Sequence, residues 1–209
     1  ESDFNWQVTS RNYGIAGNTS NQILKRMQEK KDIKRDLKKA KMMTLTVGGN
    51  DVIHVIKDNI TNLNVNTFSK PAVEYQKRLR HIIELARKDN KTLPIYIVGI
   101  YNPFYLNFPE MTEMQTIVDN WNQSTEDVCK EYDNVYFVPV NDLLYKGIDG
   151  KGGVTSSHET SQSTKSSQGS LNDALFEDDH FHPNNTGYQI MSDAILKRIN
   201  QTKKEWSGE

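Results

Sequence analysis

The densest group of reactive side chains lies in residues 177–188, which read EDDHFHPNNTGY. Asp178, Asp179, His180 and His182 stand within five positions, so this stretch is a metal site, part of a catalytic triad or a polar loop. A metal ion needs three or four converging ligands, whereas neighbours in an extended segment point to opposite sides. No second cluster of Asp and His completes such a site elsewhere in the chain. The metal interpretation is therefore the weakest.

Asp179 and His182 are three residues apart and can lie on the same side of a tight turn. The carboxylate would then accept a hydrogen bond from one ring nitrogen, while the other nitrogen faces a substrate. This is the acid and base half of a triad that activates a nucleophile. Pro183 suits the first position of a following helix and would fix the chain where the histidine must be aimed. Asp178 and His180 are interpreted as flanking polar residues.

Two glycine-rich turns offer hydrogen-bond donors. In VGGND, Asn50 follows two glycines, so its amide can point at a bound oxygen, or it can cap the next helix or turn. Asp51 is interpreted as such a cap. In GIAGNTS, the Gly17 N–H is a candidate second donor to the same oxygen; alternatively Gly17 ends a strand, and Asn18 or Thr19 caps a helix.

Strand patterns alternate with helix patterns along the chain, which indicates an α/β protein with a parallel sheet covered on both faces. The predicted strands are residues 6–15, 41–47, 94–100 and 135–140. Two short helices are predicted after residue 19, one containing Met27 and one containing Leu37, followed by longer helices at residues 69–90, 110–132 and 185–199. The inward face of the last helix is predicted to carry Tyr188, Met191, Ile195 and Ile199. Ligands bind at the carboxyl ends of parallel strands, and the polar clusters follow such ends.

Composition narrows the function classes. The 209 residues suit one domain, and 26 basic against 27 acidic side chains predict no nucleic acid partner. A single Cys129 excludes an internal disulfide, and no apolar stretch is long enough for a membrane span. Residues 146–173 are rich in Gly, Ser, Thr and Gln, which predicts a flexible surface loop with His158 as a bystander.

Three motifs, NYGIAGNTS, TLTVGGNDV and DDHFHPNNTGY, resemble in order and spacing the second, third and fifth blocks of the SGNH (GDSL-type) esterases and lipases, most closely a bacterial lipase/acylhydrolase subgroup. The resemblance spans residues 12–199 and implies a flavodoxin-like three-layer α/β/α sandwich. It implies ester hydrolysis through an acyl-serine without metal or other cofactor, on lipid acyl chains, thioesters or acetylated sugars. Gly17 and Asn50 match the oxyanion donors, and Asp179 and His182 match the triad acid and base.

The first block of the family, a Gly-Asp-Ser motif with the nucleophile, is absent from the 209 residues. In a 2-1-3-4-5 sheet the first strand lies between the second and third, so its loss would leave two unpaired edges. We therefore expect this strand and the serine upstream of Glu1, and a nearly inactive chain without them. The alternative from another class is a non-catalytic module that binds carbohydrate or lipid, and a metal-dependent phosphoesterase is a third.

The sequence also offers a candidate pocket segment and an expected location. The aromatic segment GIYNPFYLNFPE, residues 99–110, would line an acyl or sugar pocket or pack its loop onto the domain. The subgroup resemblance suggests a secreted or surface-anchored bacterial protein, with a cytoplasmic protein as the alternative. The residues carry no signal for an oligomeric state.

Overall fold

A three-stranded parallel sheet forms the centre of the protein, seen in a computed structural model. The structure describes residues 6–59, 61, 63–106, 108, 111–148 and 172–208. The strands are β1 (Met43–Thr46), β2 (Ile95–Val98) and β3 (Val135–Val138), in the order β1-β2-β3. Both pairs are parallel, with Met43 opposite Ile95 and Ile95 opposite Val135. Three of the four predicted strands are thus confirmed.

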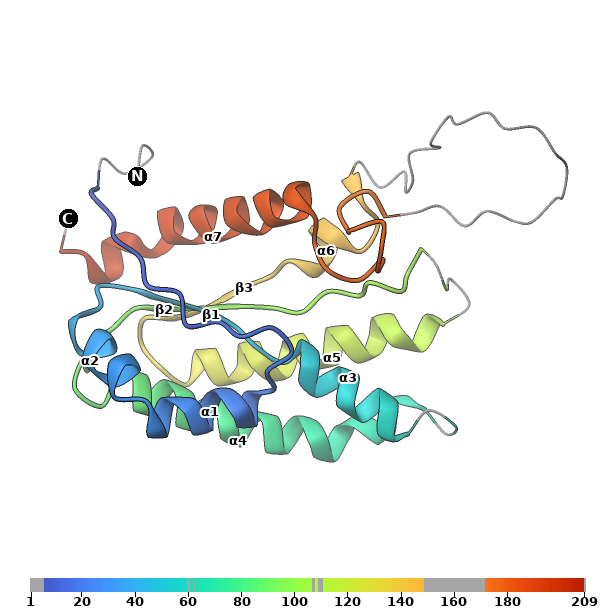
Figure 1. Cartoon of the computed structure of the whole chain (residues 1–209), viewed down its shortest axis with the longest axis horizontal. Coiled ribbons are helices and arrows are strands. Elements are labelled where there is room, and N and C mark those ends of the chain that lie inside the picture. The colour runs from blue at the N-terminus through green and yellow to red at the C-terminus, as the bar shows by residue number, and fades with distance from the viewer. Residues whose placement is uncertain are drawn as a thin grey trace, which may run out of the picture.

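Helices cover both faces of this sheet (Figure 1). One face carries α1 (Ser20–Glu29), α4 (Ser69–Ala86) and α5 (Thr112–Lys130), and the other carries α7 (Asn185–Trp206). Successive strand residues point to opposite faces, so β2 fills two cores. Ile95 and Ile97 pack in the cluster that includes α4, while Tyr96 and Val98 pack with Ile199 of α7. The three layers predicted from the sequence are present.

The remaining elements are short: α2 (Lys31–Lys39), α3 (Gly49–Asp58), a 3₁₀ turn η1 (Val65–Phe68) and α6 (Asn141–Leu144). Helix α3 follows β1 directly, after Gly48 turns the chain at a φ of 105°. Helix α1 begins with the predicted cap. The Thr19 side chain accepts from the Gln22 N–H, and the Gln22 side chain accepts from the Thr19 N–H at 2.8 Å.

The predicted strand at residues 6–15 is wrong. The segment forms no strand, and Val8 and Ile15 are about half exposed. Alternation of apolar and polar residues gives a tendency to extend, but a strand also needs a neighbour that accepts and donates its backbone hydrogen bonds. The segment instead runs from the α7 side of the sheet to the side of α1 (Figure 1). Trp6 packs on Trp206 of α7 with ring centroids 6.1 Å apart, whereas the Tyr13 carbonyl accepts from Arg26 of α1.

The predicted inward face of α7 is correct except at Tyr188. Ile199 is buried, and Met191 and Ile195 pack partly buried against the same core. Tyr188 is 52% exposed because it belongs to the first turn of the helix, whereas the contacts with the sheet core begin at Ile190. Of the predicted surface loop 146–173, residues 149–171 lie outside the described residues, and His158 lies with them. None of the helices described is long and apolar enough to span a membrane.

Candidate active site

The segment before α7 folds back on itself. Leu175 and Pro183 form an antiparallel bridge, and the Phe176 N–H donates to the His182 carbonyl at 2.8 Å. The His180 N–H in turn donates to the Phe176 carbonyl at 2.9 Å, and His180 takes a φ of 50°. Asx and His residues tolerate this left-handed region better than most. The turn therefore closes on itself and places His182 at its end.

Asn184 fastens this turn to α7. Its side-chain oxygen accepts the Gly187 N–H and caps the helix, while its amide donates to the carbonyls of Asp173 and Leu175 at 2.8 and 3.0 Å. A Cβ at Gly187 would collide with the Ala174 carbonyl, so glycine permits this close approach. Helix and turn are thus joined rigidly.

Asp179 and His182 make the predicted contact. The His182 Nδ1 lies 2.8 Å from Asp179 Oδ2, and Asp179 Oδ1 accepts the N–H groups of Phe181 and His182 at 2.8 and 3.0 Å. The bond to the His182 ring, followed by the two backbone bonds, lowers the pKa of the Asp179 carboxyl to about 2. The side chains are 57% exposed for His182 and 45% for Asp179, so solvent and ligands can reach them. The contact is confirmed; the catalytic roles remain predictions.

The Asn50 side chain reaches the turn that contains Gly17. The Asn50 amide, in the first turn of α3, donates to the Asn18 carbonyl at 3.1 Å. Gly17 has a φ of 79° and open space where a side chain would stand. In the part of the chain that the structure describes, no acceptor takes the Gly17 N–H. One N–H of the Asn50 amide therefore holds the turn, and the second makes no hydrogen bond within the described residues.

Asp51 does not cap α3, which corrects its interpretation. Its carboxylate is buried and accepts the Ser20 N–H at 2.9 Å and the Ser20 hydroxyl at 2.5 Å. Arg78 of α4 donates to Asp51 at 3.3 Å and to Ser20 at 2.7 Å. This Ser20–Asp51–Arg78 network joins the start of α1, which follows the Gly17 turn, to the start of α3, which carries Asn50. No local sequence pattern predicts that Arg78 takes part, because it lies 27 positions from Asp51.

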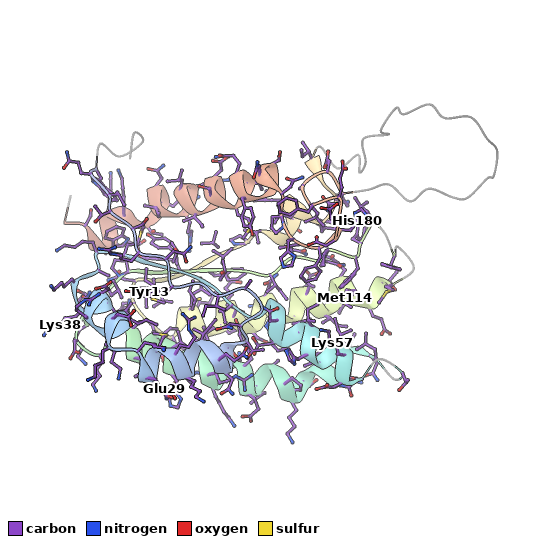
Figure 2. All side chains as sticks on the ribbon, in the orientation of Figure 1. Tyr13, Glu29, Lys38, Lys57, Met114 and His180 are labelled. Atoms are coloured by element: carbon purple, nitrogen blue, oxygen red, sulfur yellow. The ribbon has the colours of Figure 1, made fainter. Side chains whose placement is uncertain are left out.

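Both groups lie at the edge where the parallel strands end. Asn50 follows β1 almost directly, and Figure 1 shows the turn before α7 at the same end of the sheet. Figure 2 labels His180 in that turn. Among the described residues no hydrogen bond connects the turn to Asn50, so the site consists of two separate halves. This placement agrees with ligand binding at the carboxyl ends of strands.

A family comparison decides the class of protein. Residues 2–190 match the GDSL-like Lipase/Acylhydrolase family. The chain belongs to this family. It is 30% identical over 198 residues to the uncharacterized protein YpmR of Bacillus subtilis (strain 168), covering 95% of this chain and 67% of YpmR. It also resembles the crystal structure of the lipase Lip_vut3 from a goat rumen metagenome, with 18% identity and a TM-score of 0.68, over 94% of this chain and 81% of that one.

Membership in the GDSL-like family confirms the fold and supports a hydrolase. The helix-rich architecture around a parallel sheet is that of the flavodoxin-like SGNH fold, as in the lipase Lip_vut3. The family assignment concerns the whole domain and does not test which residues act.

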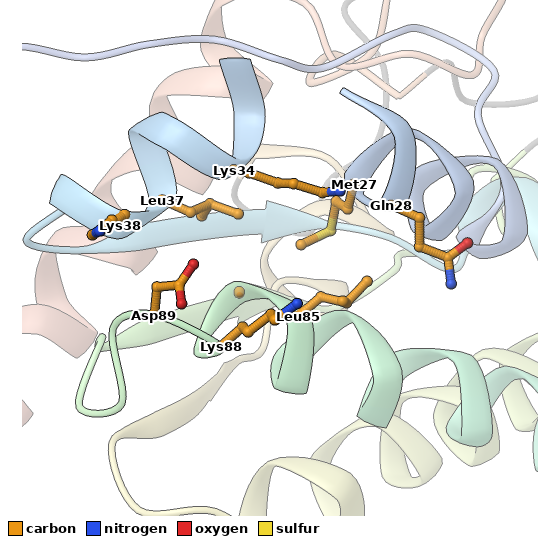
Figure 3. Close-up of a pocket in the computed structure, with 9 residues that line it drawn as sticks. Met27, Gln28, Lys34, Leu37, Lys38, Leu85, Lys88 and Asp89 are labelled. Atoms are coloured by element: carbon orange, nitrogen blue, oxygen red, sulfur yellow. The ribbon is translucent and has the colours of Figure 1, made fainter. Parts of the chain in front are cut away.

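One cavity of this GDSL-like protein lies away from the predicted site. It has a volume of about 160 Å³ and lies between α1, α2 and α4 (Figure 3). Its lining residues are Met27, Gln28, Lys34, Leu37, Lys38, Leu85, Ala86, Lys88 and Asp89. None of the predicted site residues is among them. Among the residues described, no group of three or more His, Cys, Asp or Glu side chains could hold a metal ion.

The aromatic segment after β2 mainly packs. Tyr101 and Phe104 are partly buried against the two cores, and Tyr105 packs edge-on against Tyr145 with ring centroids 4.7 Å apart. Phe108 is about half exposed, and its ring centroid lies 6.3 Å from that of Phe104. Tyr101 and Phe104 also contact the turn that carries His182.

Proposed function

We propose that this protein is a serine-dependent ester hydrolase in which Asp179 orients His182. The observation that carries the proposal is the 2.8 Å contact between the His182 ring and the Asp179 carboxylate, in a chain of the GDSL-like lipase/acylhydrolase family. A carboxylate is only an acceptor, so Nδ1 must be the donor. In the neutral ring Nε2 then carries no proton and can act as the base.

The proposed reaction has the following steps. A serine hydroxyl attacks the acyl carbonyl while His182 Nε2 takes its proton, and Asp179 stabilises the imidazolium that forms. The oxyanion of the tetrahedral intermediate is held by the Gly17 N–H and the Asn50 amide. His182 returns the proton to the leaving alcohol, and water then hydrolyses the acyl-serine by the reverse route. The substrate is a small-molecule, lipid or sugar ester.

We propose that the nucleophile lies in a Gly-Asp-Ser block upstream of Glu1. The free edge of β1 supports this, because within the described residues β1 pairs with β2 alone. Thr44 and Thr46 of β1 are also exposed, so no described segment covers this part of the strand. An unpaired edge of this kind normally needs protection. A parallel strand paired there would end at the same edge of the sheet as Asn50 and would bring its serine to the site.

The test uses the full-length protein with its upstream segment. We expect hydrolysis of p-nitrophenyl acetate and labelling by a fluorophosphonate, with mass spectrometry placing the adduct on the serine of a Gly-Asp-Ser block. His182→Ala should abolish both. A full-length protein that is folded, hydrolyses no ester and takes no label would overturn the proposal in favour of a module that binds carbohydrate or lipid. Activity that EDTA removes would instead favour a metal-dependent phosphoesterase.

A further inference from the structure

Tyr101 connects the end of β2 to the turn that carries His182. Its hydroxyl donates to the Phe181 carbonyl at 2.6 Å, across 80 positions of the chain. Burial raises the pKa of Tyr101 above its ordinary value of about 10, and the charge of Asp179 adds to the effect. The hydroxyl therefore keeps its proton over the physiological range and remains a donor.

The bond from Tyr101 acts on the peptide group just before His182. That planar group consists of the Phe181 carbonyl and the His182 N–H. Tyr101 binds its oxygen at 2.6 Å, and Asp179 Oδ1 binds its N–H at 3.0 Å. Bonds at both ends of this plane restrict its rotation and thereby position the His182 Cα. The bond from the ring Nδ1 to Asp179 Oδ2 then orients the imidazole.

Tyr101 itself stands on a fixed base. The Asn122 side chain accepts the Ile100 N–H and donates to the Ile100 carbonyl, both at 2.8 Å. On the other side, the Asn141 side chain accepts the Asn102 N–H at 2.9 Å, and Asn102 and Asn141 are both buried. The residues on either side of Tyr101 are thus hydrogen-bonded to α5 and α6, which fixes the backbone position of the tyrosine.

Asn184 fastens the base of the turn, but its outer part, residues 176–182, is exposed or only partly buried. Asp179 and His182 are about half exposed, and segments with few buried apolar contacts open easily. The rings of Phe104 and Phe181 lie 6.1 Å apart, and those of Phe181 and His182 lie 5.1 Å apart. The loop after β2 therefore supports the turn through a hydrogen bond to Phe181 and through a ring contact.

We propose that Tyr101 is a positioning residue that holds the Phe181–His182 peptide and thereby the geometry of the Asp179–His182 pair. The effect of Tyr101 on turnover rests on the proposed ester hydrolase function. Its effect on the order of the turn does not, because that follows from the hydrogen bonds alone.

The experiment compares Tyr101→Phe with Tyr136→Phe in the full-length protein. Tyr136 lies in the same core, and its hydroxyl bonds to Glu205 of α7 at 2.7 Å, away from the turn. We expect Tyr101→Phe to speed amide hydrogen exchange at Phe181 and His182 about tenfold, with β2 unchanged, and to lower kcat about tenfold with little change in KM. Tyr136→Phe should leave all three as in the wild type.

The two readouts separate the two proposals. If the amide exchange rates of Phe181 and His182 were the same in Tyr101→Phe as in Tyr136→Phe, the proposed role of Tyr101 would be overturned, whatever the ester hydrolase activity. Faster exchange in Tyr101→Phe alone supports it even if the wild type hydrolyses no ester, in which case the proposed function alone fails. Faster exchange with unchanged kcat would show that Tyr101 orders the turn without serving the reaction, and would overturn its positioning role.

Discussion

Asp179 contacts His182 at two points, through the ring Nδ1 at 2.8 Å and through the backbone N–H at 3.0 Å. Each of the two carboxylate oxygens takes one of these donors, so side chain and backbone of the histidine are held by one group. In an amide, an NH2 group replaces one of these two oxygens, and this donor would face either the ring Nδ1 or the backbone N–H.

We therefore expect Asp179→Asn to lower kcat for p-nitrophenyl acetate about 100- to 10,000-fold in the full-length protein, as loss of the orienting acid does in other triads. Asp178→Asn is the control, because Asp178 is the exposed neighbour without a predicted role. It should change kcat by less than about twofold. Equal losses in the two variants would remove Asp179 from the mechanism.

The same carboxylate gives a pH dependence. The folded-state pKa of Asp179 is about 2, below the ordinary value of about 3.9, because His182 and two backbone N–H groups bond to the ionised form. The stability that this adds is fully present above about pH 4 and is lost as the pH falls toward 2. Urea unfolding should therefore show a difference between wild type and Asp179→Asn at pH 6 that shrinks between pH 4 and 2. A difference independent of pH would contradict the assignment.

Asn50→Ala should lower kcat about 100- to 1,000-fold if its amide stabilises the oxyanion. KM should change less, because the bond strengthens mainly in the transition state. The matched control is Asn59→Ala at the other end of α3, where the amide donates only to the Val55 carbonyl at 2.9 Å. A kcat loss of the same size in the control would point to the helix rather than to the oxyanion.

Arg78→Met should lower the free energy of unfolding by about 3 kcal/mol, because it leaves the buried Asp51 carboxylate without its cation. Arg80 on the same helix makes an exposed pair with Glu131 at 2.7 Å, and Arg80→Met should cost less than about 1 kcal/mol. Urea denaturation of both variants measures the difference. Similar values would show that the Ser20–Asp51–Arg78 network contributes no more than a surface pair.

The parts of the fold that the sequence predicts are those with local causes. Residues 94–100 and 135–140 are continuous apolar runs, which suit strands buried on both faces, and both contain strands. The Thr19 cap follows from side chains three residues apart. Residues 6–15 have a strand pattern but form no strand, because pairing depends on a neighbour that the pattern does not contain.

The candidate site likewise contains contacts between near neighbours in the sequence and contacts between distant segments. The sequence by itself determined that Asp179 and His182 can meet, because residues three apart in a tight turn can lie on the same side, and the contact is present. Only the tertiary structure decided that Tyr101 holds the Phe181 carbonyl and that Asp51 pairs with Arg78, since these partners lie 80 and 27 positions apart. Contacts of that range exist only when the sheet and its helices bring separate segments together, and no local pattern of residues records them.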